Sequence, residues 1–322
     1  MLNADIIREA IARQLKKKPD ELGDKDYNQI LLLDLGGTNI SDLEPLKGLS
    51  NLQWLQLSET HVSNIEPLRG LSNLQTLYLA ETKIENVEPI KGLSNLQELY
   101  LSYTLIKNLE PITDLKNLQE LDLAGTPVSN IEPLKGLSHL RELDLSLTSV
   151  SDIENLAGLS NLQELSLAGT QVSNIEPLKG LSNLRELDLS FTPVSDIEKL
   201  AGLSNLQELW LSGTQVDNIE PLKGLQKLQR LYFSRTKVSD IEPLKKLSNL
   251  QTLNLAGTQA SNIEPLRGLS KLQRLYFSST KVSNIEPLKG LSKLQTINLP
   301  RTVSIKQVDE FKKALPEIEI HR

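Results

Sequence analysis

The stretch Leu162–Asn183, LQELSLAGTQVSNIEPLKGLSN, is a 22-residue unit that recurs through most of the chain. Twelve full copies and a thirteenth, incomplete one follow in phase, beginning at Ile30, Leu52, Leu74, Leu96, Leu118, Leu140, Leu162, Leu184, Leu206, Leu228, Leu250, Leu272 and Leu294. A fixed period of this length is the signature of a solenoid, in which each unit forms one coil that packs against its neighbours. The sequence therefore predicts one continuous stacked array without linkers.

Each unit encodes a short strand followed by a short helical turn. The pattern L-x-x-L-x-L alternates with a period of two and predicts a strand around the fourth to sixth positions. Threonine occupies the ninth position of all thirteen units, where a buried hydroxyl is expected to bond the backbone of its own and the next coil. Ten of the twelve full units then carry Glu-Pro, as in Glu176-Pro177, which favours the start of a helical turn. Asn155 and Lys199 are the exceptions.

Residues 1–29 and 303–322 flank the repeats and are predicted to be helical caps. The N-terminal segment has an apolar stripe at helical spacing, with Asn3 as the expected N-cap and Pro19 as the expected stop. The C-terminal segment has Ser304 and Gln307 at capping-box spacing before its own apolar stripe, Val308, Phe311 and Leu315. The residues 318–320 are expected to add one last strand. Polar-faced caps of this kind cover the ends of a repeat array.

The repeat LxxLxLxxT followed by VSNIEPLKGLSN resembles the 22-residue leucine-rich repeats of bacterial internalin-like and SDS22-like proteins, over about residues 30–302. It differs from their usual pattern in having threonine instead of asparagine at the ninth position. The resemblance implies an α/β fold: a right-handed horseshoe-like solenoid with a parallel concave β-sheet, short 3-10 or helical convex turns, and helical caps at 1–29 and 303–322. It also implies that the concave side recognises a protein.

Composition excludes several classes of protein. The net charge is −6 with acidic and basic residues interspersed, so no basic field is present to attract nucleic acid or a membrane surface. The absence of cysteine excludes disulfides, thiolate metal sites and thiol nucleophiles. No apolar run is long enough for a membrane span, and the first residues do not form a signal peptide. We therefore expect a monomer in the cytoplasm, or a secreted one if an export signal precedes the printed sequence.

No motif for catalysis is found. The chain has no P-loop, no G-x-G-x-x-G and no G-x-S-x-G. His61, His139 and His321 are not spaced to share a metal or to serve a catalytic triad. Carboxylates are abundant, but an open sheet offers no apolar pocket in which the pKa of one of them is raised beside a second. We predict a protein that is not an enzyme and that has no cofactor or metal.

The repeat phase predicts which side chains face a partner. If the leucines at positions one, four and six point inward, positions three, five, seven and eight point to the concave surface. Eight of the twelve aromatic residues fall there: Trp54, Tyr78, Tyr100, Tyr103, Phe191, Trp210, Tyr232 and Tyr276. They either stack between neighbouring coils, with Tyr78 beside Tyr100 and Trp210 beside Tyr232, or act as anchors for a partner. Phe233 and Phe277 replace inward leucines and are expected in the core.

The same surface is predicted to carry separate regions of opposite charge. Acidic residues recur at positions three and five: Glu98, Glu120, Glu142, Glu164, Glu186 and Glu208, with Asp122, Asp144 and Asp188. Basic residues follow at Arg230, Arg235, Arg274 and Arg301. The acidic series either reflects duplication of a 44-residue pair of units or attracts a basic segment of a partner. If the acidic series attracts a partner, the change from negative to positive charge along the surface orients that partner, because complementary electrostatic potentials set the register and the association rate of a complex.

Three hypotheses for function follow. The first is a non-catalytic scaffold that binds a protein or peptide partner on its concave face through the aromatic anchors and the acidic mid-section. The second is the recognition or regulatory arm of a larger multidomain protein, such as a Roco-type GTPase. The third is an engineered or consensus-like repeat scaffold without a dedicated ligand, because near-identical repeats are unusually designable.

Overall fold

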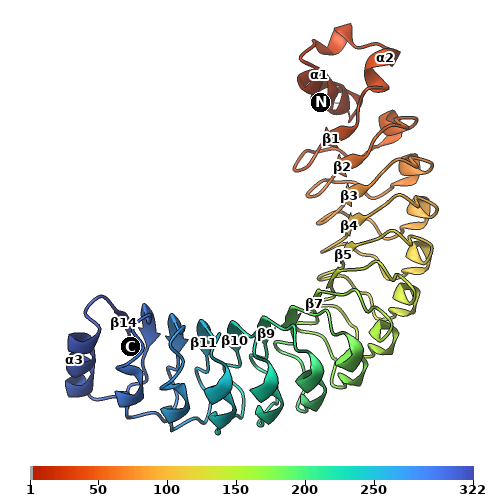
Figure 1. The fold of residues 1–322 in the computed structure, drawn as a ribbon. Helices are drawn as coiled ribbons and strands as arrows, with labels where there is room; N and C mark the ends of the chain where they lie inside the picture. Colours follow the sequence, from red (N-terminus) through yellow and green to blue (C-terminus); the bar gives the residue numbers. More distant parts are fainter. Residues whose placement is uncertain (1–2) are drawn as a thin grey trace. The chain divides into compact units, whose positions relative to one another are not determined.

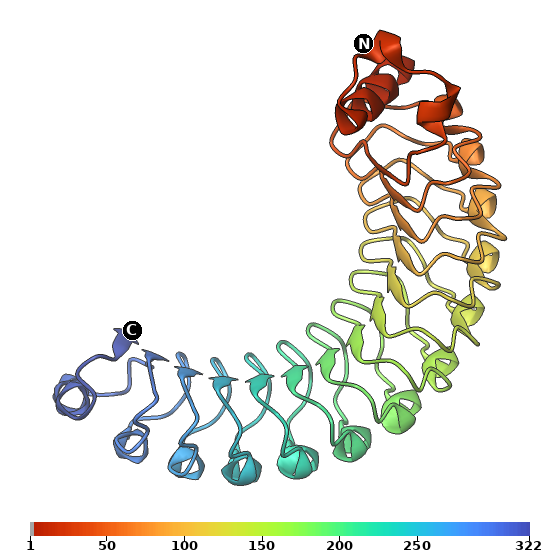
Figure 2. The same cartoon turned by 45° about the horizontal axis from the view of Figure 1, so that its top comes forward.

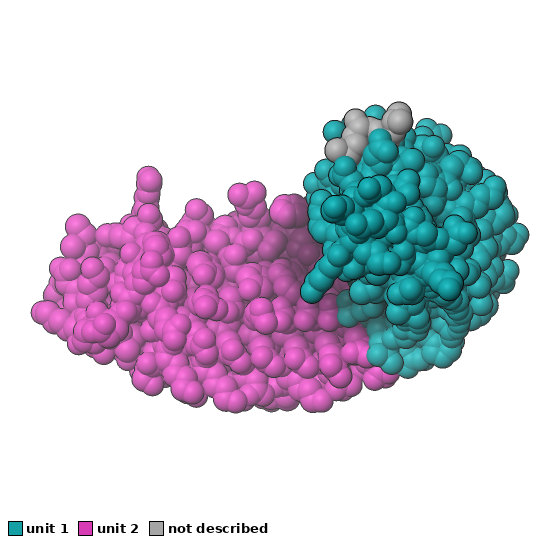
Figure 3. All heavy atoms as spheres, turned by 90° about the horizontal axis from the view of Figure 1, so that it is seen from above, with its two compact units in different colours: residues 1–162 teal, residues 163–322 magenta. Residues whose placement is uncertain are grey.

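A computed structural model describes residues 3–322, and it separates into two compact units, Met1–Leu162 and Gln163–Arg322 (Figure 3). Each unit is built from the same coil. Met1 and Leu2, which the predicted N-terminal cap includes, lie outside the described residues.

The first unit contains one three-residue strand in each coil. These strands are β1 (Leu32–Asp34), β2 (Trp54–Gln56), β3 (Thr76–Tyr78), β4 (Glu98–Tyr100), β5 (Glu120–Asp122) and β6 (Glu142–Asp144). They pair in sequence order and in parallel, so that equal positions of neighbouring coils face each other, as Tyr78 faces Tyr100. The 3-10 turns lie on the opposite side of the coils (Figure 1): η2 (Glu44–Leu46), η3 (Glu66–Leu68), η4 (Glu88–Ile90), η5 (Glu110–Ile112), η6 (Glu132–Leu134) and η7 (Glu154–Leu156).

The second unit repeats this plan. Its strands are β7 (Glu164–Ser166), β8 (Glu186–Asp188), β9 (Glu208–Trp210), β10 (Arg230–Tyr232), β11 (Thr252–Asn254), β12 (Arg274–Tyr276), β13 (Thr296–Asn298) and β14 (Glu319–His321). All of them pair in parallel and in sequence order. Its 3-10 turns are η8 (Glu176–Gly180), η9 (Glu198–Gly202), η10 (Glu220–Gly224), η11 (Glu242–Lys246), η12 (Glu264–Leu266) and η13 (Glu286–Leu288).

The strands occupy positions three to five of each unit, one residue earlier than predicted. Position six still takes part in the ladder, since the N–H of Leu79 donates to the carbonyl of Tyr100 at 2.8 Å. The chain turns directly afterwards, which ends the regular strand. The inward positions are as expected. The leucines at positions four and six, such as Leu165 and Leu167, are almost fully buried. Burial of each such side chain stabilises the fold by about 1.5–3 kcal/mol.

The predicted core aromatics are confirmed. Phe233 and Phe277 are fully buried in place of the position-six leucine. The combination of parallel strands, 3-10 turns and helical ends confirms the predicted solenoid.

The position-nine threonines of the second to twelfth units are buried, and the predicted bond to the backbone of their own coil is confirmed. Thr170 Oγ1 donates to the carbonyl of Leu167, three residues earlier in the same coil, at 2.6 Å, and the equivalent threonines of the other full units repeat this bond. The predicted bond to the next coil is made by none of these twelve threonines, whereas Thr302 of the incomplete unit donates to the carbonyl of Val282 in the preceding coil. Side-chain links between coils come instead from asparagine at position 22, since Asn73 Nδ2 donates to the carbonyl of Ser50 at 2.8 Å.

The N-terminal segment comprises α1 (Asn3–Leu15), η1 (Pro19–Glu21) and α2 (Asp24–Tyr27). Ile7 and Ile11 of the predicted stripe are buried. Pro19 does not stop α1, because the helix already ends before Lys16, whose φ is 55°. Asn3 links the helix to the first coil, since its Oδ1 accepts a hydrogen bond from the N–H of Ser41 at 2.9 Å.

The C-terminal segment is close to the prediction. The helix α3 (Ile305–Ala314) begins after Ser304, whose hydroxyl accepts a hydrogen bond from the N–H of Gln307 at 3.3 Å. Val308 and Phe311 are buried. The last strand, β14, pairs with β13 and lies one residue later than expected. Within residues 3–322, no helix has the length and apolar character needed to cross a bilayer.

Candidate functional site

The period-two alternation of each strand turns the side chains at positions three and five away from the core. Together with position eight, in the turn that follows, they form what we call the sheet face. Figure 2 shows the strand of each coil on the side opposite its 3-10 turn. Leu209 is fully buried, whereas its neighbour Trp210 is partly exposed. Trp54 and Tyr100 are likewise partly exposed. The predicted aromatic residues therefore lie on the sheet face and not in the core.

In the first unit, three aromatic side chains form a row that we call the first aromatic stack. Tyr78 and Tyr100 are parallel, with ring centroids 4.4 Å apart and an interplanar angle of 4°. Trp54 extends the row, at 5.5 Å from Tyr78 and tilted by 59°. Leu32 lies opposite Trp54 on β1 and is 52% exposed, so the apolar surface continues beyond the rings.

Carboxylates follow the first aromatic stack on β5 and β6. The hydroxyl of Tyr100 donates to Glu120 Oε2 at 2.5 Å, and burial together with this carboxylate raises the pKa of Tyr100. Asp122 faces Asp144 in the register of the two strands. Burial and the charge of Asp144 raise the pKa of Asp122, while its hydrogen bonds from the Ser102 side chain and the backbone N–H of Ala124 oppose that rise.

Two further glutamates of this unit, Glu98 on β4 and Glu142 on β6, occupy position three of their coils. Glu142 is exposed. An aromatic surface and an acidic surface therefore adjoin on one sheet face.

The second unit has a second aromatic stack, formed by Trp210 and Tyr232. Their ring centroids are 5.7 Å apart, with an interplanar angle of 2°. Glu208 is only 8% exposed and pairs with Arg230, whose Nη2 lies 2.6 Å from Glu208 Oε1. Burial and the neighbouring Glu186 raise the pKa of Glu208, whereas Arg230 lowers it.

More carboxylates precede this stack, on β7 and β8. They are Glu164, Glu186 and Asp188. The first is exposed and the other two are half-buried.

Basic residues follow the second aromatic stack on β10 to β12. Arg230 and Arg274 are exposed at position three, and Tyr232 and Tyr276 are half-buried at position five. Together they border a depression of about 510 Å³ over β11. Arg235 and Arg301 occupy position eight of their coils and are exposed. The predicted change from acidic to basic residues is thus present on the sheet face of the second unit.

Position eight has a backbone conformation that the sequence analysis missed. Tyr103 and Phe191 have φ of 55° and 58°, and the two residues are 56% and 64% exposed. Each ring covers the glycine at position eight of the next coil, because a Cβ on Gly125 or Gly213 would lie 2.6 Å from it. The alternation of glycine with larger residues at position eight was the available signal, since glycine favours positive φ.

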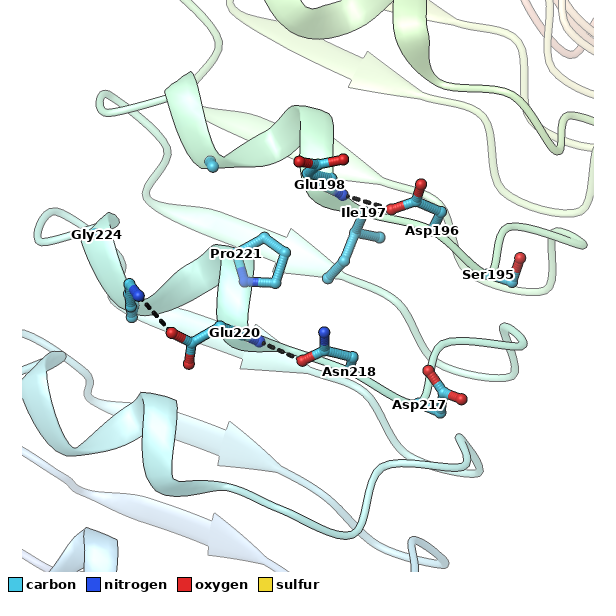
Figure 4. A pocket seen from close by; sticks show the side chains of 11 residues that line it. Ser195, Asp196, Ile197, Glu198, Asp217, Asn218, Glu220, Pro221 and Gly224 are labelled. Carbon is cyan, nitrogen blue, oxygen red and sulfur yellow. Dashed lines mark hydrogen bonds and ion pairs between the residues drawn. The ribbon is translucent and has the colours of Figure 1, made fainter.

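A second depression, of about 660 Å³, lies between η9 and η10 on the turn side, and both apolar residues and acidic or amide side chains line it (Figure 4). Asp196 Oδ1 accepts a hydrogen bond from the N–H of Glu198 at 2.8 Å, and Asn218 Oδ1 accepts one from Glu220 at 2.9 Å. Glu220 also pairs with Lys223. These groups fix the start of each 3-10 turn, and the same bonds recur in the other coils. The lining of this depression is thus explained by the turn structure.

The histidines are separate from both aromatic stacks. His61, His139 and His321 are exposed, and His139 Nδ1 lies 2.7 Å from the carbonyl of Lys116, in the place that asparagine holds in other coils. Among residues 3–322, no three His, Asp or Glu side chains are grouped in a way that could hold a metal ion.

Comparison with known protein families agrees with this architecture. The family described as "Leucine Rich repeats (2 copies)" matches residues 50–92, 94–136, 138–180, 182–224 and 226–268. The chain belongs to the leucine-rich-repeat family. A comparison with curated proteins finds no match.

Solved structures of bacterial and plant proteins share the fold. An internalin, InlF, from Listeria monocytogenes is 27% identical, with a TM-score of 0.92 over 98% of this chain and 94% of that chain. A leucine-rich-repeat protein of Leptospira interrogans is 24% identical, with a TM-score of 0.83 over 94% of this chain and 86% of that one.

A third similar structure is the ectodomain of the Arabidopsis thaliana receptor kinase GASSHO1/SCHENGEN3, in complex with CASPARIAN STRIP INTEGRITY FACTOR 2. It is 19% identical, with a TM-score of 0.67 over 87% of this chain and 39% of that chain. The chain is therefore similar in fold to internalin-like bacterial proteins and, more distantly, to this plant ectodomain.

Proposed function

We propose that this chain is a non-catalytic interaction protein whose sheet face binds a protein or peptide partner. The observation that carries the proposal is the pair of aromatic stacks, which remain partly exposed on a face that also carries many charged side chains. Tyrosine and tryptophan dominate the energetics of many protein interfaces, because they bury a large area at low entropic cost. Exposed aromatic clusters are otherwise a liability in a soluble protein.

Stacking between coils accounts for part of the arrangement but not for all of it. Pairs such as Tyr78–Tyr100 contribute about 0.2–1 kcal/mol to sheet stability. A leucine or valine at the same position would also cover the sheet, without the polar hydroxyl or indole N–H. The rings provide both an apolar surface and hydrogen-bonding groups at the surface, which is what a protein partner requires.

The acidic residues beside the stacks favour a partner with a basic segment. Asp122 and Asp144 adjoin the first stack, and Glu186 and Asp188 adjoin the second. Close carboxylates repel one another, and lysine or arginine from a partner relieves that repulsion. A stable interface covers roughly 800 Å² on each side, so an extended peptide or a globular protein suits this open surface better than a small metabolite.

The proposal can be tested by selecting peptides from a displayed random library on the immobilised chain. We expect enrichment of peptides that combine aromatic or long apolar residues with lysine or arginine. The double variant Trp210→Ala/Tyr232→Ala, or Trp54→Ala/Tyr78→Ala for peptides bound to the first unit, should weaken binding by about tenfold or more, because interface anchors typically contribute more than 1 kcal/mol each. Raising the ionic strength from low to physiological should weaken binding further, because exposed charges are screened.

The matched control is Lys179→Ala/Lys199→Ala, which changes two side chains that pair with Glu176 on the turn side. It should leave peptide affinity unchanged. If the aromatic variants keep their circular dichroism spectra and bind the selected peptides as tightly as the parent chain, the sheet face is not the binding surface.

A further inference from the structure

The second aromatic stack covers two strands, β9 and β10, and is interrupted at β11. Position five reads Trp210, Tyr232, Asn254 and Tyr276 on β9 to β12, in register. Asn254 is too short to continue the row, and its Oδ1 already accepts a hydrogen bond from the N–H of Ala256 at 3.1 Å. Parallel strands lie about 4.8 Å apart, so the backbones that carry the two tyrosines are separated by about 9.6 Å. The open depression over β11 occupies this gap.

The gap has the spacing of one missing aromatic ring. Ring centroids in the two parallel pairs of this protein are 4.4 Å and 5.7 Å apart. Twice such a distance brackets the spacing of about 9.6 Å between the strands that carry Tyr232 and Tyr276, so one planar group inserted between the two rings would continue the stack. Offset aromatic pairs are favourable at about 4.5–7 Å.

Position three of the same strands provides positive charge beside the gap. It reads Arg230, Thr252 and Arg274 in register, and Thr252 is buried. Arg230 pairs with Glu208, but none of the carboxylates in the described chain lies within ion-pairing distance of Arg274. Arg274 and Tyr276 are two residues apart on one strand and so project from the same face. A ligand that fills the gap with a ring can therefore reach Arg274 with an anionic group.

We propose that the depression over β11 binds an aromatic ring that carries an anionic ester, the chemistry of a phosphorylated or sulfated tyrosine on the partner. The ring stacks between Tyr232 and Tyr276, and the ester oxygens accept hydrogen bonds from Arg274. Guanidinium groups suit such oxyanions because they donate several parallel N–H bonds. This inference rests on the proposed protein-binding role and specifies the chemistry of one subsite.

The test uses small probes and one fluorescent reporter. In a Trp54→Phe background, Trp210 is the remaining tryptophan, and it stacks directly on Tyr232. The N-acetyl amides of phosphotyrosine, sulfotyrosine, tyrosine and phosphoserine are titrated, with calorimetry as a second readout. We expect phosphotyrosine, sulfotyrosine or both to bind about tenfold or more tightly than tyrosine and phosphoserine, since hydrogen bonds to charged groups contribute about 1.5–3 kcal/mol. The tighter of the two esters identifies the modification.

Two variants separate the contributions of charge and ring. Arg274→Gln should abolish the preference for the ester over tyrosine, whereas Arg267→Gln should not, because Arg267 pairs with Glu264 on the turn side of the preceding coil. Asn254→Tyr should fill the gap and abolish probe binding. Tyrosine is already accommodated at this position in other coils, so that variant is expected to fold.

The inference is overturned if tyrosine or phosphoserine binds as tightly as both esters, or if folded Asn254→Tyr still binds them. Either result rules out the ester subsite but not the proposed binding of a protein or peptide to the sheet face. Selected peptides would still depend on Trp210 and Tyr232 if only the ester subsite were wrong.

Discussion

At the residue scale, chemically identical side chains serve different roles according to their position in the coil. Asp122 lies on the sheet face, opposite Asp144, and its Oδ1 accepts a hydrogen bond from the N–H of Ala124 at 2.9 Å. Asp152 makes the same kind of bond, to the N–H of Glu154 at 2.9 Å, but is exposed beside a 3-10 turn. The hydrogen bond requires only an acceptor oxygen, so the negative charge of Asp122 is not needed for the fold.

This difference predicts the pH dependence of Asp122→Asn. The pKa of Asp122 is raised in the folded chain above its ordinary value of 3.8, so the folded state binds a proton more tightly than the unfolded state. The free energy of unfolding contributed by this group is therefore greatest below that value and falls as pH rises through the folded pKa. Asparagine keeps the acceptor and cannot ionise. We expect the stability difference, variant minus parent, to become more positive as the pH rises above about 4 and through the folded pKa of Asp122.

Urea unfolding followed by circular dichroism at several pH values measures this difference. Asp152→Asn is the matched control, because its hydrogen bond is equivalent and its side chain is exposed. A difference for Asp122→Asn that stays constant, or decreases as pH rises, would contradict the account.

At the scale of the coil, the fold depends on matched residues in neighbouring coils. Position eight requires positive φ, and glycine adopts it without the cost of about 1–2 kcal/mol that other residues have. Gly213 has a φ of 72° and lies beneath the Phe191 ring. Phe191 is therefore exposed to solvent and also packs on Gly213 of the next coil.

We expect Gly213→Ala to destabilise the chain by more than the roughly 1–2 kcal/mol of the backbone term alone, because the new Cβ meets the Phe191 ring at 2.6 Å. In a Phe191→Ala background, the destabilisation caused by Gly213→Ala should fall to the roughly 1–2 kcal/mol that positive φ alone costs. The four variants form a double-mutant cycle, measured by chemical denaturation. Gly224→Ala is the control, since its φ is not positive and no heavy atom lies within 4 Å of its added Cβ. An equal cost of Gly213→Ala in both backgrounds would show that the ring does not pack on the glycine.

At the scale of the whole molecule, the repeat period predicted most of the fold. The spacing of leucines decides which side chains are buried, and this needs no knowledge of distant contacts. The stacks Tyr78–Tyr100 and Trp210–Tyr232 were predicted for the same reason, since equal positions of neighbouring coils must meet. The end of α1 at Leu15 was not predicted, because Lys16 adopts positive φ without a glycine to indicate it.

The candidate site was predictable only as a set of exposed residues. The pair of Arg230 with Glu208 and the depression over β11 depend on side-chain conformations, which the repeat pattern does not specify. The same holds for the threonine bonds, because a hydroxyl such as that of Thr170 can reach more than one carbonyl, and only the folded turn selects Leu167.

Hydroxyl-radical footprinting of the chain, with and without a selected peptide, shows whether the sheet face is the binding surface. We expect the peptide to lower the reactivity of an aromatic stack, at Trp54, Tyr78 and Tyr100 or at Trp210 and Tyr232, and to leave the exposed side chains of the 3-10 turns, such as Lys179 and Arg267, unchanged. Protection of the turn side, with both aromatic stacks as reactive as in the free chain, would contradict it.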